Sequence, residues 1–239
     1  MKSTRRVWLA PAYVLHQYAY RDSSRIVEVF TGEYGRLSLF ARGAAGPKSV
    51  LKGVLRPFQR LLLSWSGRHE AGNLAGAEID GTVTSLAPAR LMSGFYLNEL
   101  ILKLTERQDP HPGIFEAYQA CIDGLSGAGA EEATLRRFEK RLLNDLGYGL
   151  DLLRTRDGAA VQADRHYRFA LETGPQPCAE EAPGAIHGQS LNDLSAESFG
   201  DARSLRDAKR VLRAAIDSCL EGRTLKSREV LVALRRAHD

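Results

Sequence analysis

The chain has 239 residues and carries 33 Lys and Arg against 29 Asp and Glu, a net charge of +4. Its length suits one large or two modest domains. No stretch is apolar for long enough to span a bilayer, and Pro11, His16 and Gln17 interrupt the start in a way that does not fit a secretory signal peptide. We therefore expect a cytoplasmic protein with no membrane segment.

The charge is distributed unevenly along the chain. Residues 1–80 hold 12 Lys and Arg against 6 Asp and Glu, whereas residues 81–239 hold 21 against 23. Between Tyr34 and His69 there are seven basic residues and no acidic one. A field of one sign suits a large anionic partner, and the commonest such partner is nucleic acid. The pattern favours a basic binding module joined to a near-neutral body.

The first 80 residues are expected to form about five short strands. Apolar segments between glycine-containing turns place them at residues 8–20, 26–30, 36–42, 58–65 and 74–79. Residues 43–47 (GAAGP) break the pattern into a loop. Short strands with glycine turns and no long helix predict a small closed barrel, for which the OB-fold is the natural candidate. Trp8 and Trp65 are expected to pack within it.

From about residue 86 the apolar period changes from two to 3.6. This predicts helices at residues 89–107, 114–125, 131–146, 204–221 and 227–237. In the first of them Leu91, Phe95 and Leu102 are expected to face inward, and Gly147 is expected to follow the third as its C′ residue. Residues 150–191 lose the helical period, which predicts loops and short strands.

The predicted fold class is therefore α+β. An N-terminal OB-fold β-barrel is expected over residues 1–80. A mainly helical C-terminal domain is expected over residues 81–239, with a small irregular β insertion at about residues 150–191.

No catalytic or cofactor motif is visible. Residues 43–49 (GAAGPKS) resemble a phosphate-binding loop, but only two residues separate the glycines and Pro47 stands where the second glycine should precede Lys48. The six histidines are scattered, and Cys178 is the only cysteine in the irregular segment, so a zinc site with four ligands is not expected. With Cys121 and Cys219 the cysteines are odd in number and far apart, which favours reduced thiols. We expect a protein that is not an enzyme and has no cofactor and no metal.

Nine short motifs follow one another over nearly the full length of the chain. They are YRDSS (20–24), TGEYGRL (31–37), ARGA (41–44), LRPFQ (55–59), SWSG (64–67), YLNEL (96–100), LRRFE (135–139), LGYG (146–149) and LKSRE (225–229). Each motif is weak alone. Together and in this order they resemble the bacterial RecO family of DNA repair proteins, the recombination mediators.

The resemblance implies an N-terminal OB-fold and a helical C-terminal domain. It implies binding to single- and double-stranded DNA, annealing of complementary strands without ATP, and association with the nucleoid. It further implies cooperation with RecR in loading RecA onto DNA coated by single-stranded DNA-binding protein (SSB), whose acidic tail is contacted. Many relatives carry a four-cysteine zinc module; the corresponding residues 167–187 keep only Cys178, so that metal site is expected to be lost.

Phosphate contacts are expected from the basic residues of the barrel, with Arg42 and Lys48 foremost because glycine and proline place them in or beside a loop. The candidates are Arg21, Arg25, Arg36, Arg42, Lys48, Lys52, Arg56 and Arg60. Aromatic residues on an OB-fold face can stack unpaired bases. Which aromatic residues do so here is left open.

A second candidate site lies on the helical domain. The helix at residues 131–146 has a stripe of Leu135, Phe138, Leu142 and Leu146, and basic residues are expected opposite it. With those of the later helix, the candidates are Arg136, Arg137, Lys140, Arg141, Arg206, Lys209, Arg210 and Arg213. A basic rim beside an apolar groove suits an acidic peptide with a hydrophobic end, such as the SSB tail, although an ordinary solvated helix face has the same pattern.

Two other functions stay open. The protein could be an OB-fold binder of single-stranded RNA or DNA in another pathway, which RNA-selective binding would favour. It could also be an adaptor whose basic face binds an acidic protein, which a lack of nucleic-acid binding would favour.

Overall fold

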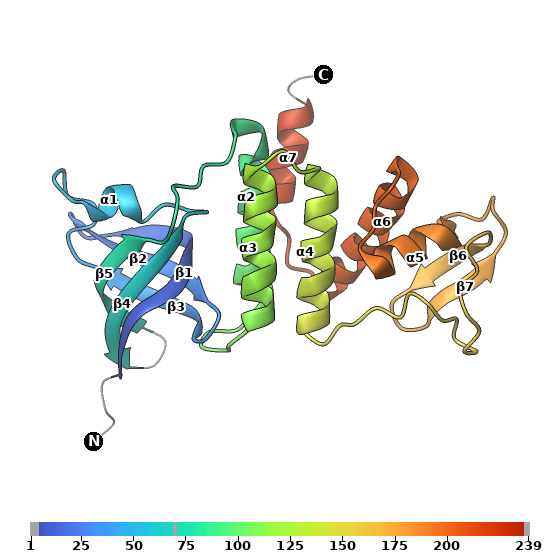
Figure 1. Cartoon of the computed structure of the whole chain (residues 1–239), viewed down its shortest axis with the longest axis horizontal. Coiled ribbons are helices and arrows are strands. Elements are labelled where there is room, and N and C mark those ends of the chain that lie inside the picture. Colours follow the sequence, from blue (N-terminus) through green and yellow to red (C-terminus); the bar gives the residue numbers. More distant parts are fainter. Residues whose placement is uncertain (1–4, 69–70, 237–239) are drawn as a thin grey trace. The chain divides into compact units, whose positions relative to one another are not determined.

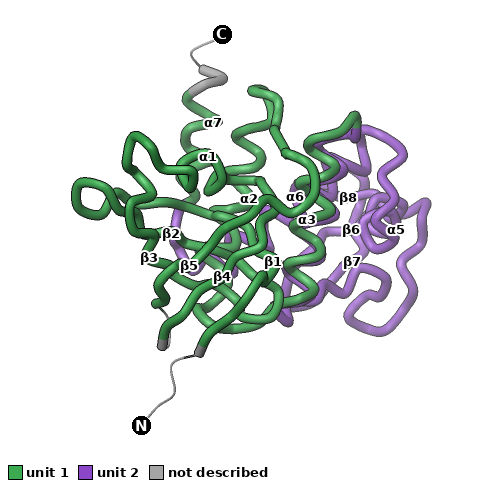
Figure 2. The backbone as a smooth tube through the Cα atoms, turned by 60° about the vertical axis from the view of Figure 1, so that its left-hand side comes forward, with its two compact units in different colours: residues 1–128, 225–239 green, residues 129–224 purple. Residues whose placement is uncertain are grey.

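The structure is a computed structural model and describes residues 5–68 and 71–236. These residues divide into two compact units, one within 1–128 and 225–239 and the other within 129–224 (Figure 2). The division lies after residue 128, because two helices that follow the barrel pack in the same unit as the barrel. A functional boundary near residue 80 stays a prediction. No helix among the described residues is long and apolar enough to cross a membrane.

The N-terminal strands close into the barrel predicted from the sequence (Figure 1). They are β1 (Arg5–Tyr20), β2 (Ser24–Thr31), β3 (Gly35–Ala41), β4 (Arg60–Arg68) and β5 (Ala71–Ile79), in the barrel order β1-β2-β3-β5-β4. Neighbouring strands are antiparallel except β3 and β5, which are parallel. Val27, Val29, Leu39, Leu61 and Leu63 alternate along their strands and are fully buried inside the barrel.

Strand β1 is long enough to pair with two neighbours. Its register shifts between Val14 and His16 on the side of β2, and between Val7 and Ala10 on the side of β4. Such bulges bend a strand and increase its twist. The bends allow β1 to close the barrel.

The turn between β2 and β3 requires glycine at position 35. Gly35 has a φ of +63°, and a Cβ built there would lie 2.2 Å from the backbone oxygen of Asp109. The hydroxyl of Thr31 accepts from the backbone N–H of Tyr34 and donates to the backbone oxygen of Gly35. The turn therefore packs directly against the backbone at Asp109.

Four helices belong to this unit: α1 (Leu51–Val54), α2 (Leu91–Leu104), α3 (Pro112–Ser126) and α7 (Lys226–Arg236), with a 3-10 turn (Pro88–Arg90) before α2. Phe115 and Tyr118 of α3 pack on Tyr13 and Phe30 from the outer face of the barrel, with ring centroids 4.9–6.5 Å apart.

The predicted inward face of α2 is wrong. Phe95 is 43% exposed, and Leu91 and Leu102 are only half-buried. The buried face is centred on Asn98, whose side-chain amide donates to the backbone oxygen of Leu15 and accepts from the hydroxyl of Tyr118. Asn98 must point inward to form these two hydrogen bonds, because a buried polar group needs a partner. The face of α2 that contains Asn98 is therefore buried, and the predicted apolar face is turned partly toward solvent.

The second unit contains α4 (Glu131–Asp145), β6 (His166–Ala170), β7 (Gly174–Cys178), β8 (Ile186–His187), α5 (Gly188–Ala196) and α6 (Ala202–Cys219). The three strands form a small sheet in the order β7-β6-β8, as expected for the irregular segment. Helix α5 was not predicted. It begins at Gly188, where a Cβ would lie 1.9 Å from the backbone oxygen of Gln162, so close packing places a poor helix former at the helix start.

Candidate nucleic-acid interface

Five of the eight basic residues predicted to contact phosphate are exposed on the barrel and its connecting loop. They are Arg21, Arg42, Lys48, Lys52 and Arg56. None of the five forms an ion pair with a carboxylate among the described residues. We refer to them as the basic cluster.

The local fold brings the basic cluster to one end of the barrel. Arg21 lies in the turn between β1 and β2, and the other four lie on the connection from β3 through α1 to β4. The backbone N–H of Ala45 donates to the backbone oxygen of Ser23 over 2.9 Å, which fastens this connection to the turn. Gly43, with a φ of +66°, lets the chain reverse directly after Arg42.

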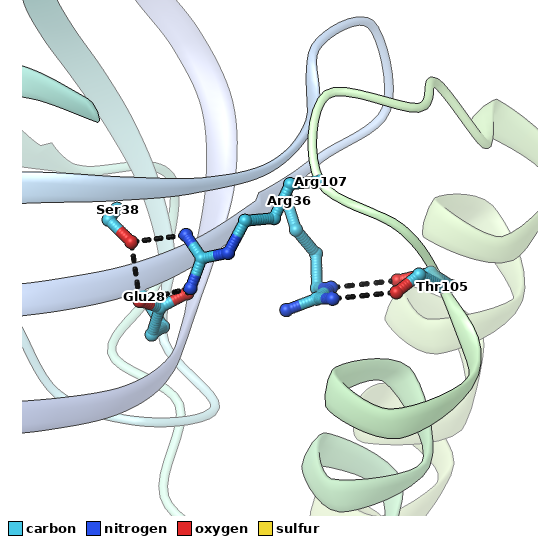
Figure 3. Close-up of polar contacts among 5 residues, drawn as sticks. All are labelled: Glu28, Arg36, Ser38, Thr105 and Arg107. Carbon is cyan, nitrogen blue, oxygen red and sulfur yellow. Dashed lines mark hydrogen bonds and ion pairs between the residues drawn. The ribbon is translucent and has the colours of Figure 1, made fainter. Parts of the chain in front are cut away.

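Arg36 is held by the fold. Its Nε donates to the hydroxyl of Thr105 over 3.0 Å and its Nη2 to the backbone oxygen of Thr105 over 2.6 Å (Figure 3). Burial and then the charge of Arg107 lower the pKa of Arg36. The guanidinium therefore fixes the end of α2 to β3 and is not presented to solvent as a free cation.

Arg60 and Arg25 are also engaged. The Nε of Arg60 forms an ion pair with Asp80 at 2.7 Å, and its Nη1 donates to Gln119. Arg25 donates to the side-chain oxygen of Gln17 over 3.2 Å. Of the two, Arg60 is neutralised by a carboxylate, whereas Arg25 keeps its net charge.

A group of exposed and half-buried aromatic residues, which the sequence did not single out, lies beside the basic cluster. Tyr18 and Phe40 flank Ile26 in one row across the outer face of β1, β2 and β3, and the rings of Tyr20 and Phe40 meet edge to face at 5.2 Å. Tyr18 is 50% exposed and Tyr20 38%. We call Tyr18, Tyr20 and Phe40 the aromatic platform.

Two arginines of the basic cluster lie over the aromatic platform. Arg21 is 5.3 Å from the ring centroid of Tyr20, and Arg42 is 5.8 Å from that of Phe40. These distances suit cation–π contact. Strand parity was the available signal, because Phe40 has the opposite parity to the buried Leu39 and so must point outward.

The two tryptophans differ. Trp65 is buried and packs edge to face on Tyr34, which confirms the expected packing role. For Trp8 that expectation is wrong, because its side chain is 69% exposed. Trp8 lies in the bulge of β1, where Leu9 has a φ of +50° and its N–H donates to the hydroxyl of Ser64.

The basic side chains of α4 are largely occupied within their own unit. Arg136 was expected opposite the apolar stripe, but it is buried and forms an ion pair with Glu139 at 2.7 Å. Lys140 donates to the backbone oxygen of Ser195, and Arg137 to that of Glu197. Arg141 forms an ion pair with the carboxylate of Glu197 at 2.7 Å. Arg137, Lys140 and Arg141 thus place positive charge at the C-terminal end of α5, which favours the helix dipole.

The basic side chains of α6 are more accessible. Arg206, Lys209, Arg210 and Arg213 are all exposed. Arg206 and Arg210 line an open groove of about 540 Å³ together with Arg203, His166 and His187, and with the acidic residues Glu180 and Asp207. Arg210 forms an ion pair with Asp207 at 2.9 Å and donates to the backbone oxygen of Ala185. Burial and then the charge of Arg203 lower the pKa of His187.

The cysteines and histidines were not expected from the sequence to form a metal site. Among the described residues, Cys121, Cys178 and Cys219 form no disulfide bond. Cys178 and His187 are the cross-strand partners of His166 on either side. Within residues 5–68 and 71–236, no group of three or more His, Cys, Asp or Glu side chains is arranged to hold a metal ion.

The chain matches two family models, described as the N-terminal part of recombination protein O over residues 4–82 and its C-terminal part over residues 86–229. It is 41% identical to "DNA repair protein RecO" of Azoarcus sp., over 98% of this chain and 99% of that protein. It is 40% identical to the proteins of the same name from Dechloromonas aromatica and Methylococcus capsulatus, over 94% of this chain and 95% and 93% of theirs. The chain therefore belongs to the RecO family of DNA repair proteins.

Proposed function

We propose that this protein binds single- and double-stranded DNA through the basic end of its barrel and anneals complementary strands without ATP. The observation that carries the proposal is the basic cluster, five exposed cations with no carboxylate partner within residues 5–68 and 71–236, two of which lie over the aromatic platform. The protein acts as a DNA-binding mediator and not as an enzyme, and it needs no cofactor or metal for this activity.

The proposed mechanism uses two physical effects. Lysine and arginine neutralise phosphates and release counterions, which supplies affinity that does not depend on sequence. The aromatic platform stacks unpaired bases, which favours single strands with little base preference. Two strands held on such a surface repel each other less, so base pairing itself drives annealing.

We further propose that the protein works with RecR to load RecA onto SSB-coated DNA. Membership of the RecO family supports this role. For the acidic tail of SSB we propose the groove at α6, because Arg203, Arg206 and Arg210 are exposed and line one groove, although Arg210 also pairs with Asp207. The cations of α4 do not line this groove and are engaged with Ser195 and Glu197. On this proposal residues 1–80 are the DNA-binding domain, residues 81–239 serve partners, and the protein associates with the nucleoid in the cytoplasm.

The test is annealing of complementary strands coated with SSB, with ATP withheld. We expect the wild-type protein to accelerate annealing and the variant Arg42→Glu with Lys48→Glu to lose most of that acceleration. The variant Arg156→Glu with Arg165→Glu changes net charge equally at exposed positions of the second unit and should behave as wild type. RNA-selective binding would instead indicate another pathway, and a lack of any nucleic-acid binding would indicate a protein adaptor.

A further inference from the structure

A pocket of about 310 Å³ opens beside the aromatic platform, where β1, α1 and α2 meet. Its walls are apolar, from Leu15, Leu51, Leu55 and Phe95, and its rim carries Arg25, Lys52 and Arg56. All of these residues belong to the first unit. The volume lies at the lower end of the roughly 300–1,000 Å³ range of small-ligand sites.

The composition of the pocket indicates a ligand with an apolar body and a negative charge at one edge. No carboxylate lines it, whereas three cations do. His16 adds a ring that can donate or accept a hydrogen bond, whereas the side-chain amide of Gln17 already donates to the backbone oxygen of Leu55 and accepts from Arg25. A nucleobase with its attached phosphate has this combination of properties.

The pocket is held open by contacts outside it. Gly94 lets the ring of Phe58 approach α2, since a Cβ at position 94 would lie 2.7 Å from that ring. The ring of Phe58 then meets Phe95 edge to face at 5.2 Å. Phe95 thus keeps a partly exposed ring at the mouth of the pocket, although it is an apolar residue on a helix.

The pocket and the aromatic platform are continuous. The ring of His16, which lines the pocket, meets the ring of Tyr18 edge to face at 4.5 Å. A single strand lying over Tyr18 therefore reaches the pocket by way of a neighbouring residue on β1.

We propose that this pocket receives one unpaired nucleotide of a bound single strand, with its base against Phe95 and its phosphate at Lys52 and Arg56. The inference rests on the proposed DNA-binding function. It assigns to the same surface a site that contacts an unpaired base, whichever base it is. A paired base cannot enter, because it is held in the duplex stack. The pocket therefore favours single strands over duplexes.

The test compares three ligands of equal length with the full-length chain: a single strand, the same strand with abasic residues, and the duplex. Phe95→Ala should weaken binding of the base-bearing single strand about fivefold to tenfold, the low end of what an aromatic contact contributes per base. Binding of the abasic strand and of the duplex should not change. Phe95→Tyr should retain wild-type affinity, and Val83→Ala, at an exposed apolar position away from the pocket lining, is the matched control.

Leu51→Trp, which fills the pocket from α1, provides a second variant in case Phe95→Ala fails to fold, and it should produce the same base-selective loss. An equal loss on all three ligands, or no loss on the base-bearing strand, would overturn the proposal. The proposal would also be overturned if Phe95→Ala weakened the binding of an acidic peptide that ends in phenylalanine and left DNA binding unchanged. If the wild-type chain binds none of the three DNA ligands, the proposed function itself fails; if it binds them without base selectivity, only this inference fails.

Discussion

The Nη2 of Arg107 donates to both carboxylate oxygens of Glu28, each over 2.9 Å. Glu28 lies on β2 and is only 4% exposed, and Ser38 of β3 donates to the same carboxylate while accepting from Arg107 (Figure 3). Together with the contacts of Arg36 to Thr105, this network fastens the chain after α2 to the outer face of the barrel.

Arg107→Ala should destabilise the protein, because it leaves the Glu28 carboxylate buried without its cation. Removing one partner of a buried pair typically lowers the free energy of unfolding by roughly 3–5 kcal/mol; we expect about 2 kcal/mol here, because the Arg107 side chain is 34% exposed. Urea unfolding measures the loss. Combining Arg107→Ala with Glu28→Gln should recover part of it, and strictly additive losses would show that the two groups are not coupled.

DNA binding should depend strongly on salt. If the five cations of the basic cluster each neutralise one phosphate of a single strand, the logarithm of the binding constant should fall against the logarithm of salt concentration with a slope of about −3 to −4. Reversing charge at Arg42 and Lys48 should flatten the slope and weaken binding to all sequences alike. Fluorescence anisotropy over a salt series measures this; a flat wild-type profile between low and physiological salt would exclude the basic cluster as the main contact.

Removing the aromatic platform should affect single strands selectively. Tyr18→Ala combined with Tyr20→Ala should weaken single-strand binding by about 1–3 kcal/mol, because stacked bases lose their partners, while duplex affinity changes little. Trp8→Ala removes a more exposed aromatic residue from the other half of β1 and serves as the control. Equal weakening of duplex binding would mean that the tyrosines support the fold and not base stacking.

The attachment of α7 should depend on pH through Glu99. This carboxylate accepts from the backbone N–H groups of Lys226 and Ser227 over 2.9 and 2.8 Å, and from the Ser227 hydroxyl over 2.7 Å. Burial opposes ionisation, but the hydrogen bonds from Ser227 and Lys226 and the charge of Lys103 outweigh it and lower the pKa of Glu99.

Because the folded-state pKa lies below the unfolded value, Glu99 stabilises the protein above about pH 4.3 and loses this effect as pH falls through the lower, folded-state pKa. Glu99→Gln should therefore speed amide exchange in α7 at neutral pH. The difference in unfolding free energy between wild type and variant should shrink in acid. A difference that stays constant into strong acid would show that ionisation of Glu99 does not matter.

A synthetic peptide of the acidic SSB tail should bind the full-length chain with an affinity on the order of micromolar, because ordering a short peptide offsets much of a small contact. Arg206→Glu with Arg210→Glu should abolish binding. Arg137→Glu with Arg141→Glu should have a smaller effect, because those cations do not line the groove and already contact Glu197. Isothermal titration measures both variants, and the opposite ranking would place the peptide on α4.

The strands and helices could be predicted from local patterns. The glycine turn at residues 31–37 and the alternation around Val27 and Leu39 specify a hairpin, because side chains on a strand alternate between core and solvent. Helix α5 was not predicted because it begins at Gly188, and glycine has a low helix propensity. Glycine is needed there because the backbone of Gln162 leaves no room for a Cβ, and this contact cannot be read from the local sequence.

The sequence by itself determined the barrel, the helical segments and the excess of positive charge between Tyr34 and His69, since these follow from composition and period. Only the tertiary structure decided which of those charges are available for binding. Arg36 is engaged by Thr105 and Arg60 by Asp80, whereas Arg42 and Lys48 remain exposed. The loop favoured Arg42 and Lys48 in the sequence, but nothing there indicated that Arg36 and Arg60 would be engaged. A cation is engaged by whichever polar or charged groups the fold places within a few ångströms, and for Arg36 those groups belong to Thr105, 69 residues away along the chain.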